Sequence, residues 1–316
     1  MVDVAILGFG TVGSGVYEVT RKNKDILENR SGKLIRVKKI FDKKDFSSHP
    51  AKHLFALDFQ EILDDSEISI VIEAIGGLSP AFEYTKNALK NGKSVVTSNK
   101  ELVDKHGIQL QKLASDNNVS YLFEASVGGG TPIIRPLKHC LVANRVVEIS
   151  GILNGTTNYI LTQMFSQETS FEEALADAIR KGYAEQDPTD DVEGYDVERK
   201  IRILARLAFG NDIEIDEIPV TGISTISLED IRKAKKDESV IKLIARAKFE
   251  NGKVLCEVKP TRISNENPLY GVNGVFNAVV VDAKPVGRVM FYGQGAGKLP
   301  TASAVVADVV AIIQGK

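Results

Sequence analysis

The chain has 316 residues, of which 43% are hydrophobic and 26% charged, and its formal net charge is −2. This length allows two globular domains, and the mixed charges exclude a basic field for binding nucleic acid or a membrane surface. Its apolar runs are too short to span a bilayer, its start lacks the features of a signal peptide, and Cys140 and Cys256 have no metal-ligand spacing.

The first 130 residues alternate between short apolar runs and helical segments. Strand-like runs are found at residues 3–8, 34–41, 68–74, 93–98 and 119–125, with helix-like stretches at 79–92 and 100–118. The first, third and fifth runs are almost continuously apolar, as in parallel strands that are covered on both faces. This order predicts an α/β fold with a Rossmann-like, doubly wound parallel sheet.

From residue 131 the pattern indicates a second, mixed α/β domain. A strand ending in a glycine turn at 148–155 precedes three predicted helices, at about 156–166, 170–181 and 191–208. Strand-like runs follow at 240–250, 252–263, 277–283 and 287–293, and the Asn-Gly pair at 251–252 predicts a hairpin. The last segment, 300–314, is predicted to be an apolar helix.

A glycine motif directly follows the first strand and precedes a helix. Gly8 suits a tight turn, Gly10 lets the backbone approach a pyrophosphate, and Gly13 permits close packing of helix on strand. The free amides at the helix N-terminus favour an anion. The sequence therefore predicts a dinucleotide site formed by Gly8, Phe9, Gly10, Thr11, Val12 and Gly13.

The end of the second strand bears on the choice of dinucleotide. Asp42 can accept hydrogen bonds from both ribose hydroxyls, which favours NAD. The adjacent Lys43 and Lys44 can instead hold a 2′-phosphate, which favours NADP. Because the acid favours NAD and the lysines favour NADP, we expect poor discrimination between the two dinucleotides, with a slight preference for NAD.

The segments after the third and fourth strands lie where ligands bind in a doubly wound sheet. Lys100 lies in one of these segments, at a predicted helix start where the helix dipole disfavours a cation. A functional role therefore explains Lys100 better than a surface role does. The predicted cofactor contacts from these segments are Ala74, Ile75, Gly76, Ser98 and Lys100.

The predicted helix at 191–208 directs a lysine into its apolar face. Val197, Ile201 and Leu204 fall on one side, and Lys200 projects from the same stripe with Asp196 one turn before it. An exposed pair at this spacing stabilises a helix by only about 0.2–0.5 kcal/mol, whereas burying an ammonium costs several kcal/mol before compensation. This position favours a functional lysine over a helix-stabilising pair.

Together these motifs resemble those of the homoserine dehydrogenases. The stretch from Ala178 to Lys200 matches the signature of that family, and the similarity extends to residues 8–13, 97–100, 123–134, 151–161 and 293–310. The resemblance is to the short form, without the regulatory ACT domain or the aspartate kinase of some members. It implies NAD(P)-dependent interconversion of L-aspartate 4-semialdehyde and L-homoserine, on the route to threonine, methionine and isoleucine.

The resemblance also implies roles for individual residues. It implies that Lys200 and Lys100 act in proton transfer at the same site. Glu185, Asp191 and Asp196 are implied to line the substrate pocket, and the turn at Gly155 and Thr156 to contact the substrate. A monovalent cation, Na⁺ or K⁺, is implied, with Glu124 and the backbone carbonyls of Val127, Gly129 and Thr131 as its ligands.

The resemblance further implies that the last helix returns to the first domain. The dinucleotide-binding domain then comprises residues 1–130 and 295–316, with Gly295 and Gly297 near the cofactor, and residues 131–294 form a substrate-binding and dimerisation domain. A homodimer in the cytoplasm is expected, acting on a small-molecule substrate, without nucleic acid or membrane as partner.

The residues fit this chemistry and leave two questions open. Hydride addition to an aldehyde leaves developing negative charge on oxygen, which a lysine ammonium can stabilise and protonate. Glu185 and Asp191 suit the substrate ammonium, while either Lys100 or amides near Thr156 can bind its carboxylate. Which of Lys100 and Lys200 is the principal acid also stays open.

Two other functions are less consistent with the sequence. A phosphorylating aldehyde dehydrogenase needs an activated cysteine nucleophile, but Cys140 and Cys256 both read as buried apolar positions. A non-catalytic NAD(P) sensor would have little reason to keep Lys100, Asp196 and Lys200 together.

Overall fold

The structure is a computed structural model that describes residues 1–210, 215 and 217–315. The chain forms two compact units, Met1–Gly130 with Ala296–Lys316, and Thr131–Gly295. The return to the first unit thus begins at Ala296, one residue later than the predicted 295. A Cβ atom on Gly295 would lie 1.9 Å from Nδ2 of Asn277 in the second unit, so glycine is required where the chain leaves this unit.

The first unit contains the predicted parallel sheet, in the order β2-β1-β3-β4-β5. Its strands are β1 (Val2–Leu7), β2 (Ile35–Phe41), β3 (Ile68–Glu73), β4 (Ser94–Thr97) and β5 (Tyr121–Leu122). Its helices are α1 (Thr11–Lys22), α2 (Lys24–Ser31), η1 (Lys52–Leu54), α3 (Gln60–Asp64), α4 (Ala81–Lys90), α5 (Lys100–Asp116), α6 (Ala125–Gly128) and α12 (Lys298–Ile313). The prediction of a Rossmann-like sheet is confirmed.

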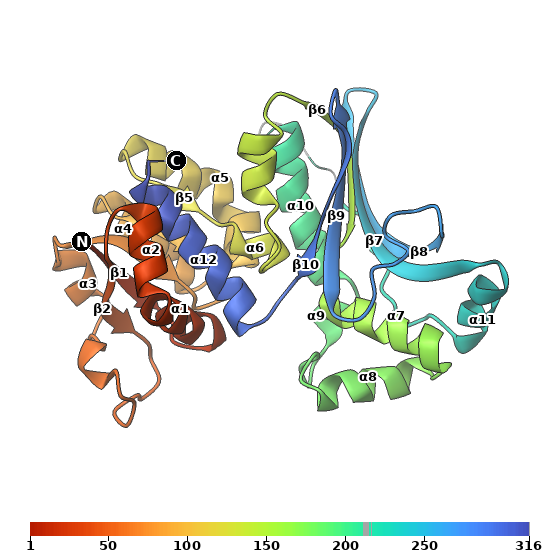
Figure 1. Ribbon diagram of the computed structural model, residues 1–316, viewed down its shortest axis with the longest axis horizontal. Helices are drawn as coiled ribbons and strands as arrows, with labels where there is room; N and C mark the ends of the chain where they lie inside the picture. The colour runs from red at the N-terminus through yellow and green to blue at the C-terminus, as the bar shows by residue number, and fades with distance from the viewer. Residues whose placement is uncertain (211–214, 216, 316) are drawn as a thin grey trace. The chain divides into compact units, whose positions relative to one another are not determined.

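The C-terminal helix belongs to the core of this first unit. Val4 and Ile6 of β1 pack in one buried cluster with Val16 of α1 and with Val305 and Val309 of α12. Figure 1 shows α12, in blue, beside α1, in red, although the two helices come from opposite ends of the chain. Burying a large aliphatic side chain stabilises the fold by about 1.5–3 kcal/mol, which explains why so apolar a helix packs there.

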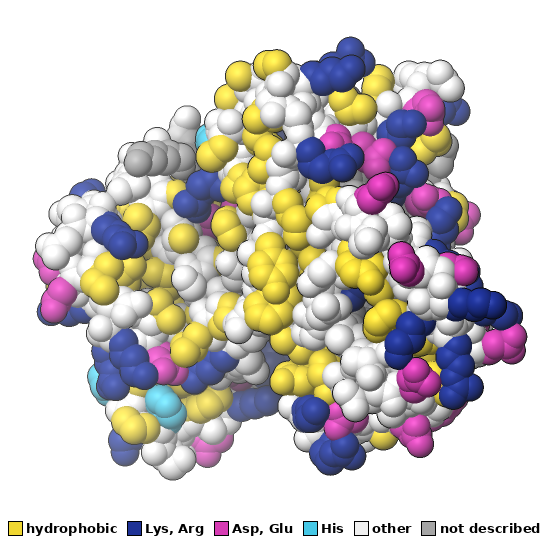
Figure 2. Space-filling model, turned by 45° about the vertical axis from the view of Figure 1, so that its right-hand side comes forward, with side chains coloured by type: hydrophobic (Ala, Val, Ile, Leu, Met, Phe, Trp, Pro, Cys, Tyr) yellow, Lys and Arg dark blue, Asp and Glu magenta, His cyan; other side chains and the backbone are white. Residues whose placement is uncertain are grey.

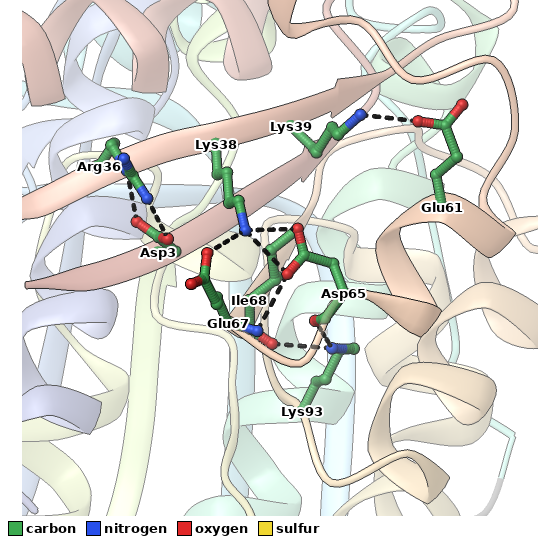
Figure 3. A network of polar contacts seen from close by, with 9 residues as sticks. All are labelled: Asp3, Arg36, Lys38, Lys39, Glu61, Asp65, Glu67, Ile68 and Lys93. Carbon is green, nitrogen blue, oxygen red and sulfur yellow. Dashed lines mark hydrogen bonds and ion pairs between the residues drawn. The ribbon is translucent and has the colours of Figure 1, made fainter.

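A polar network stabilises the amino-terminal edge of this sheet (Figure 3). Arg36 Nε and Nη2 donate to the Asp3 carboxylate at 2.7 and 2.5 Å. Lys93, only 4% exposed, donates to the carbonyls of Asp65 and Ile68 at 2.7 and 2.9 Å. The strands of a parallel sheet start at this edge, so these charges leave the carboxyl edge for ligands.

The second unit is built on an antiparallel sheet in the order β10-β9-β6-β7-β8. Its strands are β6 (Arg145–Ile152), β7 (Ser239–Glu250), β8 (Lys253–Ser264), β9 (Phe276–Lys284) and β10 (Gly287–Gln294). Its helices are η2 (Pro136–Cys140), α7 (Gly155–Gln167), α8 (Phe171–Arg180), α9 (Thr189–Val192), α10 (Tyr195–Phe209) and α11 (Leu228–Lys236). Asn251 and Gly252, with φ of 53° and 83°, form the predicted hairpin between β7 and β8.

The prediction of one helix at 191–208 is wrong at its start. The chain forms two helices, α9 and α10, and Gly194 between them has φ of 87°. That left-handed conformation ends α9 and starts α10 in a new direction, which an apolar pattern alone does not reveal. Asp191 therefore lies on α9, whereas Asp196 and Lys200 lie on α10.

Charged side chains of both signs are interspersed on the face of the molecule in Figure 2. That distribution agrees with the near-neutral net charge of −2. In the part of the chain that the structure describes, every helix is too short or too polar to cross a membrane.

Lys242 of β7 is a buried cation surrounded by uncharged oxygens. It is 2% exposed, and its Nζ donates to Oδ1 of Asn158 at 3.0 Å, to the carbonyl of Val272 at 2.5 Å and to Oδ1 of Asn273 at 3.0 Å. These bonds tie the first turn of α7 to the segment before β9. Burial lowers the pKa of Lys242 from 10.5 to about 8.

This shift predicts a pH-dependent contribution to stability. Between about pH 8 and pH 10.5 the unfolded chain binds the Lys242 proton and the folded protein does not, so the free energy of unfolding rises with pH in this window. Across this pH window we expect the free energy of unfolding of the wild type to rise by about 3 kcal/mol relative to that of Lys242→Met. Urea unfolding of both proteins at the two pH values measures this, with exposed Lys233→Met as the control. Parallel pH curves for wild type and Lys242→Met would contradict it.

Candidate active site

The glycine loop after β1 fits a dinucleotide pyrophosphate. A Cβ on Gly8 would lie 2.6 Å from the carbonyl oxygen of Ala74, and one on Gly13 would lie 1.9 Å from that of Gly8. A Cβ on Gly10 would meet no atom within 4 Å. Glycine is thus needed at 8 and 13 for packing, while the open space at Gly10 lies at the N-terminus of α1, where an anion is favoured.

A hollow of about 270 Å³ lies at the carboxyl edge of the sheet, beside this loop. Asp42 at its rim accepts hydrogen bonds from the backbone N–H of Phe9 at 2.5 Å and of Lys44 at 2.8 Å. The side chains of Lys43 and Lys44 are exposed. Six of the predicted cofactor residues line this hollow: Gly8, Gly10, Asp42, Lys43, Ala74 and Ile75. The rest of its lining is Phe41, Lys44, Pro80 and Tyr84.

A buried carboxyl group supports the loop that lines this hollow. Glu73, at the end of β3, is 0% exposed. It accepts hydrogen bonds from the backbone N–H of Ile75 at 2.8 Å and of Gly76 at 3.3 Å, and from Oγ1 of Thr97 at 2.5 Å. Burial raises the pKa of Glu73, and these bonds oppose the rise. Glu73 therefore joins the ends of β3 and β4.

Lys100 is the first residue of α5 and is half-buried. The preceding Asn99 caps this helix, since its side chain accepts from the N–H of Leu102 at 3.1 Å. Nδ2 of Asn99 also donates to the carbonyl of Gly77 at 2.6 Å. Ser98 is half-buried at the carboxyl edge. These contacts hold Lys100 at the same edge as the glycine loop.

Four residues were predicted to ligate a monovalent cation. Three of them lie in the first unit: Glu124, Val127 and Gly129. Glu124 is 5% exposed, and its backbone N–H donates to Oδ2 of buried Asp308 in α12 at 2.8 Å. Thr131 is the first residue of the second unit. Among the described residues no group of three or more His, Cys, Asp or Glu side chains can hold a metal ion. Three of the four predicted ligands are backbone carbonyls, so the cation site stays a prediction.

The two predicted glycines near the C-terminal helix fall in different units. Gly297, with φ of 124°, caps α12 in the first unit, while Gly295 is buried in the second. Lys298, which follows Gly297, pairs with Glu18 of α1 at 2.8 Å. The start of α12 is thereby fixed to the helix that follows the glycine loop.

The central feature of the second unit is the buried ion pair on α10. Lys200 is 9% exposed and Asp196 is 2% exposed. Lys200 Nζ donates to Oδ2 of Asp196 at 2.7 Å and to the carbonyl of Leu153 at 2.8 Å. The predicted burial of Lys200 and its pairing with Asp196 are confirmed.

A second carboxylate lies close to this pair. Nδ2 of Asn154 donates to Oδ1 of Asp191 at 2.7 Å and to Oδ2 of Asp196 at 2.9 Å. Burial and the negative charge of Asp196 raise the pKa of Asp191, while Asn154, Lys200 and Thr156 oppose the rise. The Asn154 amide thus joins two acids, one of which, Asp196, is paired with Lys200.

The predicted turn at Gly155 and Thr156 lies beside this cluster, at the start of α7. A Cβ on Gly155 would lie 2.7 Å from the carbonyl oxygen of Val275. Oγ1 of Thr156 donates to the carbonyl of Tyr183 at 2.7 Å, which ties the turn to the segment carrying Glu185. Glu185 itself is exposed and forms no hydrogen bond or ion pair with the other described residues.

Sequence reasoning missed three polar groups of these sites. They are Asn154, Glu73 and Asn99, each buried and each bonded to more than one partner. For Asn154 and Asn99 a signal was available, because asparagine directly before a helix is a common N-cap. For Glu73, an acid ending an apolar strand, the sequence offered no clear signal.

Comparison with known families identifies both units. Residues 132–310 match the family model for homoserine dehydrogenase, and residues 8–124 match the model for the homoserine dehydrogenase NAD binding domain. The two matches together cover most of the chain.

Individual relatives agree with these matches. Homoserine dehydrogenase of Bacillus subtilis is 41% identical over 98% of this chain and 72% of its own length. The structure of the enzyme from Thiobacillus denitrificans has a TM-score of 0.94 at 40% identity and covers 99% of this chain and 73% of its own. A hyperthermophilic archaeal homoserine dehydrogenase in complex with NADPH has a TM-score of 0.84 at 30% identity, covering 100% of this chain and 98% of its own. The chain therefore belongs to the homoserine dehydrogenase family.

Proposed function

We propose that the second unit binds L-homoserine or L-aspartate 4-semialdehyde around Lys200, and that the first unit binds the dinucleotide. The family consists of NAD(P)-dependent oxidoreductases that interconvert these two compounds. The observation that carries the proposal is the Lys200 ammonium, which is buried on the mainly apolar face of α10 and held by two acceptors.

The proton chemistry follows from the hydrogens of Lys200. An ammonium carries three, and those donated to Asp196 and Leu153 account for two within the described structure. The third is available to the substrate oxygen. In the reduction it stabilises the developing alkoxide and transfers as a proton, and in the oxidation the neutral amine takes it back. Lys100, on the first unit, is proposed to act at the same substrate.

The acids provide counter-charges for the substrate ammonium. Asp191 is half-buried and Glu185 is exposed, so both retain accessible carboxylate surface, while Asp196 is committed to Lys200. The backbone amides near Thr156, at the N-terminus of α7, suit the substrate carboxylate. Charged groups of both signs thus surround an amino-acid substrate.

The first unit is proposed to hold NAD or NADP at the glycine loop. When bound, the nicotinamide cofactor supplies or takes up the hydride. Asp42 at the rim suits ribose hydroxyls and supports the slight preference for NAD, while the exposed Lys43 and Lys44 suit a 2′-phosphate. The open space at Gly10 is where the pyrophosphate fits.

Two remaining expectations are also proposals. A monovalent cation, Na⁺ or K⁺, is proposed at Glu124 and the carbonyls of Val127, Gly129 and Thr131. A cytoplasmic location is proposed, supported by Cys140 and Cys256, which form no disulfide. The prediction that both cysteines are buried is wrong for Cys140, which is exposed.

Replacing Lys200 tests the proposed proton donor. We expect Lys200→Met to lower kcat for L-homoserine oxidation by about 10²- to 10⁴-fold, because the general acid–base group is lost. Since this variant leaves Asp196 buried without its cation, at a cost of about 3–5 kcal/mol, the double variant Asp196→Asn/Lys200→Met tests activity in a fold that lacks the charge. Steady-state kinetics with NAD⁺ and NADP⁺, and thermal unfolding, measure both effects.

A matched control lies in the same unit. Lys233 pairs with Glu229 at 2.7 Å with the same i,i+4 spacing, but both side chains are exposed. Lys233→Met should keep wild-type kcat. Near-normal kcat in a folded Lys200 variant would refute the assignment of Lys200, and a wild-type protein inactive with both cofactors would refute the proposed function.

The rim of the hollow generates a second prediction, about cofactor choice. Lys43→Ala/Lys44→Ala should raise KM for NADPH about tenfold or more, because a charge-assisted contact to the 2′-phosphate is worth about 1.5–3 kcal/mol, and leave KM for NADH within about twofold. Lys52→Ala, at another exposed lysine in η1, is the control. Equal changes for both cofactors would show that these lysines do not read the 2′-phosphate.

We also propose a homodimer formed through the second unit. Tyr292 on β10 and Leu255 on β8, the two edge strands of its sheet, are each 52% exposed. Light scattering after size-exclusion chromatography is expected to give twice the chain mass of 34.4 kDa. A mass of one chain at micromolar concentration would contradict the dimer.

A further inference from the structure

Asn154 lies where four elements of the second unit meet. It follows β6, precedes α7, and contacts α9 and α10 through Asp191 and Asp196. It is 5% exposed. The two carboxylates that it contacts are 37 and 42 residues away in the sequence, so the tertiary fold alone brings them to one amide.

Every hydrogen-bonding group of this amide is used. Oδ1 accepts from the N–H of Thr157 at 2.8 Å and from its Oγ1 at 3.1 Å. Nδ2 has two hydrogens, and its contacts with Asp191 and Asp196 account for both. The capping of α7 fixes the amide plane, and that plane in turn fixes where the two carboxylates can lie.

The negative charges of Asp191 and Asp196 determine which side chain can occupy the position of Asn154. Asp191 and Asp196 repel each other in a buried environment, and Lys200 donates to Asp196. A neutral donor shared by both acids stabilises them without adding a positive charge. A second cation there would neutralise Asp191, the half-buried acid that still faces accessible space.

We propose that Asn154 is a positioning residue that holds Asp191 and Asp196 in different roles, Asp196 on the Lys200 ammonium and Asp191 toward the substrate ammonium. The inference rests on the proposed function of Lys200 and Asp191. Asn154 acts through these residues and does not itself react. Its capping of α7 is what makes the positioning rigid.

Two substitutions separate this role from helix capping. Serine and aspartate cap helices about as well as asparagine, so Asn154→Ser and Asn154→Asp both keep an acceptor for Thr157. Both lose the amide that bridges the two acids: ionised aspartate has no donor, and serine has a single hydroxyl hydrogen on a shorter side chain, which cannot serve Asp191 and Asp196 together. In Asn154→Ser we expect kcat to fall by about tenfold or more and KM for L-homoserine to rise, with KM for the dinucleotide unchanged. In Asn154→Asp the loss should be larger, because a third carboxylate joins the cluster.

The pH dependence supplies a readout that a purely structural role would not change. Loss of the donor removes a bond that favours the ionised acids, so the acid limb of the kcat/KM profile should move up by about one pH unit. The pKa of Asp191, followed by NMR of the side-chain carboxylate in the free protein, should rise in Asn154→Ser. Ser170→Ala removes the side-chain cap of α8 and is the control, expected to lower Tm while leaving the pH profile and kcat unchanged.

The outcomes are distinct. Folded Asn154→Ser and Asn154→Asp proteins with wild-type kcat, KM and Asp191 titration would overturn the role of Asn154 and leave the proposed function standing. A wild-type protein that does not oxidise L-homoserine would overturn the proposed function, and the Asp191 titration in the two variants would still decide whether Asn154 holds the acids.

Discussion

A buried ammonium requires oxygen atoms around it, and this requirement at Lys200 organises the second unit. Asp196 and the carbonyl of Leu153 meet it, and Asp196 in turn needs the donor that Asn154 provides. The end of β6, the start of α7 and both helices α9 and α10 must therefore converge at one point. Because an unpaired charge in that place would cost several kcal/mol, the fold and the site are specified together.

Lys242 is also a buried ammonium that needs oxygen partners, but its role is structural. All three of its partners are uncharged oxygens, and burial lowers its pKa to about 8. Lys200 is paired with a carboxylate, and its two hydrogen bonds leave one ammonium hydrogen for a substrate. A lysine whose donors are all used ties loops together, whereas one with a hydrogen left over can serve chemistry. The partners of each lysine, more than its burial, distinguish the two roles.

The first unit separates stability from ligand binding along one sheet. Ion pairs and buried lysine contacts gather where the parallel strands begin, around Arg36 and Lys93. At the opposite edge Glu73, Thr97 and Asn99 support the segments that line the hollow and carry Lys100. Parallel strands place all their carboxyl ends together, so a few side chains there can hold two loops at once.

The periodic and local features of this protein can be read from its amino-acid sequence. Glycine spacing, apolar runs and the Asn-Gly pair predicted the parallel sheet, its anion site and the β7–β8 hairpin, and helical periodicity placed Lys200 inside. Three features became visible only in the folded chain: Gly194 breaks the helix, Lys242 is buried among neutral oxygens, and Asn154 bridges two acids. Periodicity reports which face a side chain occupies, because that depends on neighbours in the chain. The partners of a buried polar group depend on segments far away in sequence, whose approach only the packed fold sets.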